Sequence, residues 1–299
     1  GDILLHNKGE HDFVEVRVST TVIAAAAFRN NDKIKRVDLP EGIAEIPENC
    51  FQNCSSLEEV NISDGLQTIG MGAFSGSGVR HIKLPNGVTK IGYGAFYNCQ
   101  HLMDINLPES IESVSYDSFE NTWFLKHIEA DEYGCKYAEG ILLGYTGEGI
   151  TKVKIKDGTR AIAGEAFENA ENIKEVFIPR SVKTMGASTF LLCFNLEQVV
   201  FEEGIQIKKI ESFTFAGCKS LEKINLPKSL KWIGCYAFTR CVFESITIPE
   251  HVEHLDLFAI RECYSLKEIV LPKRLEGQYY WVEAYKEKTP KLTFYCISP

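Results

Sequence analysis

Apolar residues recur along this chain in short clusters at a regular interval. The frame is apolar-x-x-apolar-x-apolar, as in Leu57 to Ile62, and it returns from Leu102 to Leu107 and from Leu266 to Leu271. The third apolar residue of each cluster is taken here as an anchor. The anchors, spaced by 22 to 25 residues, are Val16, Leu39, Ile62, Leu84, Leu107, Ala130, Ile155, Ile178, Phe201, Leu226, Ile248 and Leu271. Self-similarity at a fixed period of this size predicts about eleven stacked repeat units.

Each unit carries two further apolar positions after its anchor. An apolar residue stands seven positions on, at Ile23, Ile46, Ile69, Ile91, Val114, Ile162, Met185, Ile233 and Leu255. An aromatic corner residue stands twelve positions on, at Phe28, Phe51, Phe74, Phe96, Phe119, Phe167, Phe190 and Phe238, with Ile260 in the last unit. The unit that starts at Phe201 has two extra residues near Gly204 to Ile207, so its equivalents are Ile210 and Phe215.

The alternation before each proline predicts a short β-strand. Val60 and Ile62 would face inward while Glu59 and Asn61 face out, and a proline such as Pro85 ends the strand. A turn, a second apolar stretch and the Ala-Phe corner follow. Because no unit can bury its own apolar face, stacking supplies the core. The predicted fold is a β-rich solenoid, a right-handed superhelix with a parallel sheet, short turns, little helix and a cap at each end.

The frame predicts a single solenoid over residues 1–299, interrupted once. Between Ala130 and Ile155 there is no Ala-Phe corner, and Tyr133 to Tyr145 predicts two short strands around Glu139-Gly140, a hairpin-like repeat that would bend the solenoid. The predicted parts are an N-terminal cap (1–15), repeats (16–129), the variant repeat (130–154), repeats (155–272) and a C-terminal cap (273–299). In the last cap we expect an aromatic stretch (Tyr279, Tyr280, Trp281 and Tyr285) before a final strand at Leu292 to Tyr295.

The repeat is almost intact from Ile82 to Leu102, where it reads Ile-x-Leu-Pro-x-x-Val-x-x-Ile-Gly-x-x-Ala-Phe-x-Asn-Cys-x-x-Leu. This pattern resembles the BspA-type leucine-rich repeats over about residues 13 to 272, and the segment from Tyr137 to Leu143 resembles that family's intervening hairpin. The resemblance implies a leucine-rich-repeat solenoid from a bacterial or protozoan protein. Relatives are often found at the surface of oral and gut microbes and are associated with adhesion. The motif residues are structural, so no adhesion residue carries over.

Charge and hydropathy restrict the classes of partner that this chain is expected to bind. The net charge is −9 and the sequence pI is near 5.4, which opposes binding to nucleic acid and anionic lipid. No apolar run reaches the roughly 18 residues that a membrane-spanning helix needs, so no membrane insertion is expected. The sequence begins at Gly1 without an initiator Met, which favours a processed or engineered fragment from which any signal peptide has been removed.

Cysteines and asparagines occupy repeat positions. The ten cysteines are Cys50, Cys54, Cys99, Cys135, Cys193, Cys218, Cys235, Cys241, Cys263 and Cys296. Six of them lie three residues after the corner residue, where Thr122 and Ala170 stand in other units, so we expect small, buried, unpaired side chains; whether neighbouring thiols pair stays open. Two residues after the corner stand Asn30, Asn53, Asn98, Asn121 and Asn169. We expect these amides to bond loop backbone groups.

Motifs of catalysis and metal binding are weak. His251-Val-Glu-His254 is either a metal pair or two solvated turn histidines, and the absence of a helical zinc pattern favours the second. No Cys-x-x-Cys pair suggests zinc. The segments Gly70-Met-Gly72 and Gly92-Tyr-Gly94 recur at the repeat period with no helix after them, so backbone geometry explains them better than phosphate binding. No Gly-x-Ser-x-Gly, Walker or His-Glu-x-x-His motif is present. We therefore expect no catalytic, cofactor or metal site.

The outward strand positions are the candidate contact surface. The residue before each anchor is polar in the first half of the chain, and then Phe177 and Val200 fall on adjacent predicted strands. Exposed apolar side chains mark contact surfaces more often than charges do. The predicted partner-binding residues are Lys152, Lys154, Glu175, Phe177, Gln198 and Val200. Alternatively, Phe177 and Val200 merely favour strands, or the variant hairpin covers them.

These observations favour a non-enzymatic, monomeric interaction module. The resemblance implies an extracellular or cell-surface adhesion protein, and the outward strand positions predict that it binds a protein or glycan ligand through the sheet face. The ten cysteines, which need no oxidation, are equally compatible with a cytoplasmic protein-protein interaction scaffold. An enzyme would require a polar cluster in one pocket.

Overall fold

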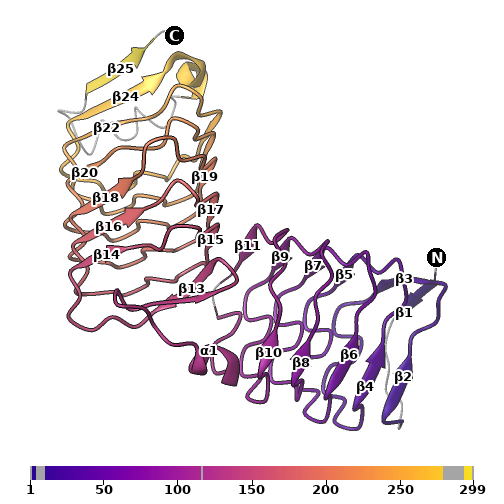
Figure 1. The fold of residues 1–299 in the computed structure, drawn as a ribbon. Helices are drawn as coiled ribbons and strands as arrows, with labels where there is room; N and C mark the ends of the chain where they lie inside the picture. Colours follow the sequence, from indigo (N-terminus) through magenta and orange to yellow (C-terminus); the bar gives the residue numbers. More distant parts are fainter. Residues whose placement is uncertain (1, 5–10, 116, 279–292, 298–299) are drawn as a thin grey trace. The chain divides into compact units, whose positions relative to one another are not determined.

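Each turn of the chain passes through two short strands and a corner, and the turn repeats with little change. The computed structural model describes residues 2–4, 11–115, 117–278 and 293–297. The chain divides into two compact units, Gly1–Glu129 and Ala130–Pro299, and each is a β-solenoid (Figure 1). Their parallel strands make about eleven turns with almost no helix, which confirms the fold predicted from the sequence.

In the first unit, the strands before the anchors form one face and the strands seven residues after the anchors form another. The first face contains β2 (Phe13–Glu15), β4 (Arg36–Asp38) and β6 (Glu59–Asn61), and further along β8 (His81–Ile82) and β10 (Asp104–Ile105). The second contains β5 (Glu45–Ile46), β7 (Thr68–Ile69), β9 (Lys90–Ile91) and β11 (Ser113–Val114), while β3 (Thr20–Ile23) pairs with β1 (Asp2–Leu4). Every pairing is parallel and joins residues one turn apart, as Val37 with Val60.

The second unit repeats this arrangement after an antiparallel hairpin. The hairpin joins β12 (Cys135–Ala138) to β13 (Ile141–Tyr145) and lies where it was predicted, around Glu139-Gly140. Strand β13 then pairs in parallel with β15 (Ala161–Ile162), followed by β17 (Thr184–Met185), and the same face continues with β19 (Lys209–Ile210), β21 (Trp232–Ile233) and β23 (His254–Leu255).

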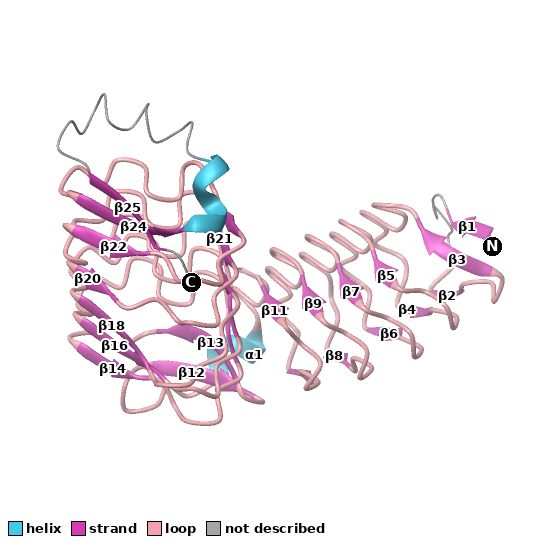
Figure 2. Ribbon diagram, turned by 90° about the horizontal axis from the view of Figure 1, so that it is seen from above, coloured by secondary structure: helices cyan, strands magenta, loops and turns pink. Residues whose placement is uncertain are grey.

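The other face of the second unit is formed by strands of two to five residues. It contains β14 (Lys152–Lys154), β16 (Glu175–Ile178), β18 (Gln198–Phe201) and β20 (Lys223–Ile224), then β22 (Ser245–Thr247), β24 (Glu268–Pro272) and β25 (Thr293–Ile297). Strand β25 is the predicted last strand; Leu292 and the aromatic stretch Tyr279, Tyr280, Trp281 and Tyr285 lie outside the described residues. Figure 2 shows how short these strands are relative to the turns between them.

Helix is confined to two short segments among the described residues, α1 (Trp123–His127) and the 3-10 helix η1 (Lys273–Gln278). Thr122 caps α1, because its hydroxyl oxygen accepts a hydrogen bond from the main-chain N–H of Leu125 at 3.1 Å. The helix follows the corner at Phe119 and lies just before the end of the first unit at Glu129.

The corner residues form two stacks of buried rings. In the first unit the distance between the ring centroids of successive corner residues is 4.9 to 5.5 Å, for Phe28, Phe51, Phe74, Phe96 and Phe119. In the second unit Phe167, Phe190, Phe215 and Phe238 stack at 5.0 to 5.5 Å, and Tyr145 of the hairpin continues the stack at 5.2 Å. Each buried phenylalanine contributes about 2 kcal/mol of hydrophobic free energy, so the predicted corner residues are a substantial part of the core.

The anchors are less uniform than predicted. Most are buried, but Ile62, Phe201 and Leu226 are half-buried, and Ala130 is exposed. Ala130 differs because it starts the hairpin segment, where its only pairing is an antiparallel bridge to Lys136. The insertion near Gly204 to Ile207 buries both Ile205 and Ile207 and leaves Gln206 outside.

The asparagine column has a different role from the one expected. Asn30, Asn53, Asn98, Asn121 and Asn169 are all exposed and have φ between 55° and 60°. The left-handed conformation tolerates asparagine better than most residues, so the backbone of the corner, and not a buried amide, selects it. Among these side chains, Asn53 donates to Asn30 at 3.0 Å.

The paired glycines follow the same geometry. A Cβ on Gly92 would lie 2.8 Å from the carbonyl carbon of Gly70 in the preceding turn, and Gly94 has a φ of 56°. Close backbone approach therefore requires the first glycine and the left-handed conformation favours the second. These segments are structural, as predicted.

Candidate functional site

The six predicted contact residues lie together on one face of the second unit, on β14, β16 and β18. Lys152, Glu175 and Gln198 are register partners across the three strands. Two positions on, Lys154 pairs with Phe177 and Phe177 with Val200. We call these six residues the sheet strip. The parallel register, one turn per strand, brings residues 23 positions apart in the sequence side by side.

The sheet strip is charged along one row and more apolar along the other. The Nζ atom of Lys152 is 2.7 Å from Oε2 of Glu175, and this hydrogen bond raises the pKa of Lys152. Phe177 and Val200 are half-buried, so the exposed apolar pair expected from the sequence is only partly accessible. In-register strands place each side chain against its neighbours one turn away, and these neighbours cover part of both residues. Lys154 and Gln198 are exposed.

A second group of exposed side chains lies at the corners of the second unit. Two positions before the corner residue, Phe213, Tyr236 and Phe258 stand in three successive turns. Their rings stack, with centroids 5.1 Å apart for Phe213 and Tyr236 and 5.5 Å for Tyr236 and Phe258. Phe213 and Phe258 are 40% and 44% exposed, so this stack lies on the surface. We call these three residues the aromatic column.

Two residues of the aromatic column occupy an unfavourable backbone conformation. Phe213 and Tyr236 have φ of 59° and 55°, in the left-handed region that bulky residues rarely adopt. The equivalent positions in other turns are mostly small or polar, namely Ala26, Asn49, Gly72, Gly94, Asp117, Glu165 and Ser188. Such a conformation costs on the order of 1 kcal/mol or more per residue. Phe213 and Tyr236 are therefore not explained by corner stability.

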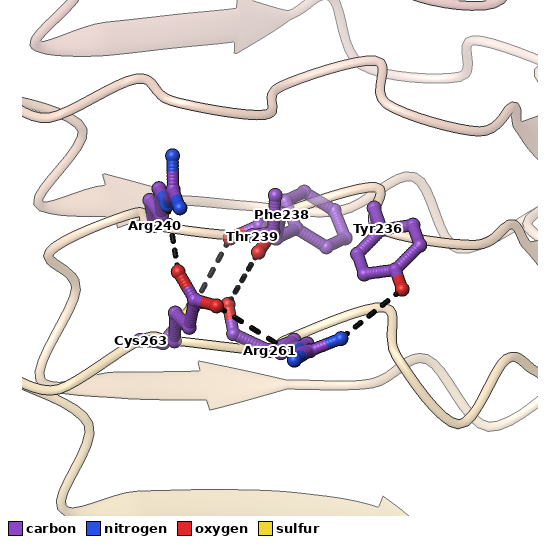
Figure 3. A network of polar contacts seen from close by, with 7 residues as sticks. Tyr236, Phe238, Thr239, Arg240, Arg261 and Cys263 are labelled. Carbon is purple, nitrogen blue, oxygen red and sulfur yellow. Dashed lines mark hydrogen bonds and ion pairs between the residues drawn. The ribbon is translucent and has the colours of Figure 1, made fainter.

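Two arginines and a glutamate connect the aromatic column to the next part of the corner (Figure 3). Arg261 donates from a terminal nitrogen to the hydroxyl of Tyr236 at 3.2 Å, and its guanidinium lies over the rings of Tyr236 and Phe258. The carboxylate of Glu262 is 3.6 Å from Nε of Arg261 and 2.7 Å from Nε of Arg240. The hydrogen bond with Glu262 raises the pKa of Arg240.

A pocket opens beside this network. It has a volume of about 390 Å³ and is lined mainly by Lys219, Arg240, Val242, Glu262, Tyr264 and Ser265. Tyr264 is 72% exposed at its edge. The Nζ atom of Lys219 lies 4.6 Å from the centroid of the Phe194 ring, a cation–π contact. We call these six lining residues the corner pocket.

The sequence contained a signal for this region that the strand-based prediction did not use. The prediction used only the outward strand positions, and therefore did not include the residues that lie next to the corner. Comparing residues two positions before each corner shows the change from small or polar residues to Phe213, Tyr236 and Phe258 in consecutive units.

The two histidines of the His251-Val-Glu-His254 segment have different surroundings. His254 stacks on Trp232 with ring centroids 3.7 Å apart, and His251 is exposed. Across the part of the chain that the structure describes, no group of three or more His, Cys, Asp or Glu side chains is arranged to hold a metal ion. The same residues contain no helix with the length and apolar character needed to cross a membrane.

The repeat geometry corresponds to a known family. A family model described as BspA type leucine-rich repeat region matches residues 21–136, 145–207 and 204–282, in six copies. The chain belongs to this family. The BspA-type match includes all the residues of the sheet strip, the aromatic column and the corner pocket. No curated protein sequence matches the chain significantly.

Solved structures of leucine-rich repeat proteins are similar to this BspA-type chain at low identity. A leucine-rich repeat protein from Bacteroides ovatus is 22% identical, with 95% of this chain and 83% of that chain covered and a TM-score of 0.39. A leucine-rich cell surface protein from Faecalibacterium prausnitzii is 24% identical, covering 94% of this chain and 64% of that one, with a TM-score of 0.39. The pneumococcal vaccine antigen PcpA is 17% identical, with 99% and 91% covered and a TM-score of 0.48.

Proposed function

We propose that this BspA-type solenoid is a non-catalytic binding module that holds a protein or glycan partner on the sheet strip. The observation that carries the proposal is the register of β14, β16 and β18, which places Lys154, Phe177 and Val200 in one row beside the charged row of Lys152 and Glu175. An apolar centre with a charged margin is the usual composition of a protein contact surface. The opposite side of the same strands is core, with Val153, Val176 and Val199 buried.

The module would act in adhesion at a cell surface, as a monomer. Membership of the BspA-type family supports this location. A cytoplasmic interaction scaffold is the second candidate, and the nine cysteines found free among the described residues favour it, because reduced thiols are characteristic of the cytosol. The full-length gene separates the two: a signal peptide, lipobox or wall anchor supports adhesion, and a start directly at the repeats supports the scaffold.

The binding proposal is tested with a solid-phase screen of the full chain against immobilised host matrix proteins and glycans. For any ligand found, Phe177→Ala should weaken binding at least about tenfold, as truncation of a central aromatic does, while the urea midpoint stays close to that of the wild type. Tyr97→Ala, an exposed tyrosine in the first unit, is the matched control and should bind normally. A screen that is negative across the panel would count against the proposal, as would equal binding by both variants.

A further inference from the structure

The aromatic column and the corner pocket form one continuous surface in the second unit. Arg261 contacts the rings of Tyr236 and Phe258, and its neighbour Glu262 lines the pocket. Glu262 in turn pairs with Arg240, which also lines the pocket. The aromatic column therefore leads into the corner pocket, and each charged side chain of this surface contacts an aromatic ring or an oppositely charged group.

The charge of this surface is opposite to that of the chain. At the aromatic column and corner pocket, the positive charges of Lys219, Arg240 and Arg261 are balanced only by the negative charge of Glu262. The whole chain, in contrast, has a net charge of −9. No ion pair of Lys219 is found in the described parts of the chain, where its ammonium group contacts the face of Phe194. A pocket with an excess of cations favours an anionic group, and carboxylates pair well with guanidinium and ammonium groups.

The geometry of the rings favours a protein segment over a sugar. The C–H bonds of a sugar ring pack on the electron-rich face of an aromatic ring. In the aromatic column, the rings of Phe213, Tyr236 and Phe258 face one another at 5.1 and 5.5 Å, and Arg261 lies over two of them. Neighbouring rings and Arg261 therefore occupy ring faces that a sugar would need. Tyrosine and arginine beside a small apolar concavity are the residue types that dominate protein interfaces.

We propose that the corner pocket and aromatic column bind an acidic segment of a partner protein, with its carboxylates at Lys219 and Arg240 and an apolar side chain against Val242 and Tyr264. This site is separate from the sheet strip and does not depend on the proposed function of that strip. The unfavourable conformations of Phe213 and Tyr236 support it independently, because aromatic residues occupy these positions in spite of the backbone preference.

The test uses the full chain and fluorescein-labelled peptides of alternating Glu and Tyr, with Gln-Tyr and Lys-Tyr peptides of equal length as controls. Fluorescence anisotropy should show binding of the Glu-Tyr peptide alone, and the affinity should fall as salt is raised. Lys219→Gln and Tyr264→Ala should each weaken binding at least about fivefold. Lys152→Gln removes the same charge from the sheet strip and should leave peptide binding unchanged, which separates this site from the proposed function.

Three results would overturn the proposal. One is equal binding of the Glu-Tyr and Lys-Tyr peptides, and another is undiminished binding by both Lys219→Gln and Tyr264→Ala. The third is binding of carboxylated or sulfated glycans, competed by neither peptide, with no binding of the Glu-Tyr peptide. Because Lys219 and Tyr264 are exposed, circular dichroism should show the same fold for both variants, so a loss of binding reports on the site.

Discussion

The Sγ atom of Cys193 lies 2.9 Å from the main-chain oxygen of Phe167, and the thiol donates a hydrogen bond to it across one turn of the solenoid. The same bond recurs in other turns, from Cys54 to Phe28, Cys99 to Phe74, Cys218 to Phe190, Cys241 to Phe215 and Cys263 to Phe238, at 2.9 to 3.3 Å. The cysteine column therefore combines a small buried side chain with a donor for a carbonyl that each corner presents. The predicted packing role is confirmed, and the hydrogen bond adds a reason for cysteine over alanine.

Replacing one of these thiols should destabilise the second unit measurably. We expect Cys193→Ala to lower the free energy of unfolding by about 1–2 kcal/mol, because a buried hydrogen bond and a small volume are both lost. Urea unfolding followed by circular dichroism measures the change. Cys235→Ala is the control, since that thiol lies outside the column and is half-buried. Equal effects of the two substitutions would show that the hydrogen bond contributes nothing.

The cysteines should also differ in reactivity. Burial raises the pKa of Cys54 and Cys99 to about 11 and of Cys193 and Cys263 to about 12, so these thiols are protonated near neutral pH and shielded from reagent. Treatment of the folded protein with iodoacetamide at pH 7.5, followed by peptide mass spectrometry, should label Cys235 first among the nine described free cysteines. Early labelling of Cys193 would contradict its burial.

The phenylalanine stack should carry much of the stability of the first unit. Phe96→Ala removes a fully buried ring between Phe74 and Phe119 and should cost about 3–5 kcal/mol. Tyr97→Ala, one residue further on and 38% exposed, should stay within about 0.5 kcal/mol of the wild type. Urea unfolding of both variants tests the assignment of inside and outside. A larger effect for Tyr97 than for Phe96 would reverse it.

The first unit should lose stability as pH rises toward neutrality. Hydrogen bonding with Asp117, with a contribution from burial, raises the pKa of Glu120 from its ordinary value of 4.5 to about 7. The folded state therefore binds this proton more tightly than the unfolded state, so its stabilising effect is complete below pH 4.5 and is lost as pH rises through 7. Thermal unfolding between pH 4.5 and 8 should show this decline.

Glu120→Gln supplies the test of that assignment. The glutamine amide can donate to Asp117 at every pH, so the part of the decline between pH 4.5 and 7 should disappear. Glu112→Gln, at an exposed position of the preceding turn segment, should keep the wild-type profile. If Glu120→Gln and wild type decline in parallel, another group is responsible.

The periodic part of this fold was predictable because its cause is local to the sequence. Ile91 and Phe96 stand seven and twelve positions after their anchor Leu84, as their equivalents do in most turns, so spacing alone identifies them as interior. The hairpin at Glu139-Gly140 was recognisable because the corner residue is missing there. The partial burial of Phe177 was not predictable, since it depends on side chains one turn away. The role of Asn98 was predicted wrongly, because a left-handed backbone conformation cannot be recognised from the pattern of polar and apolar residues.

The one-turn register constrains how such a chain can change in length. Ile69 pairs with Ile46 on one side and Ile91 on the other. Deleting a single residue within such a strand would send its apolar side chains to the opposite face, whereas excising one full period would leave Ile46 able to meet Ile91 in matching register. The solenoid can therefore lengthen or shorten only by whole repeats. A genetic duplication or deletion of one full period changes the number of turns, while each remaining strand still pairs with an equivalent strand.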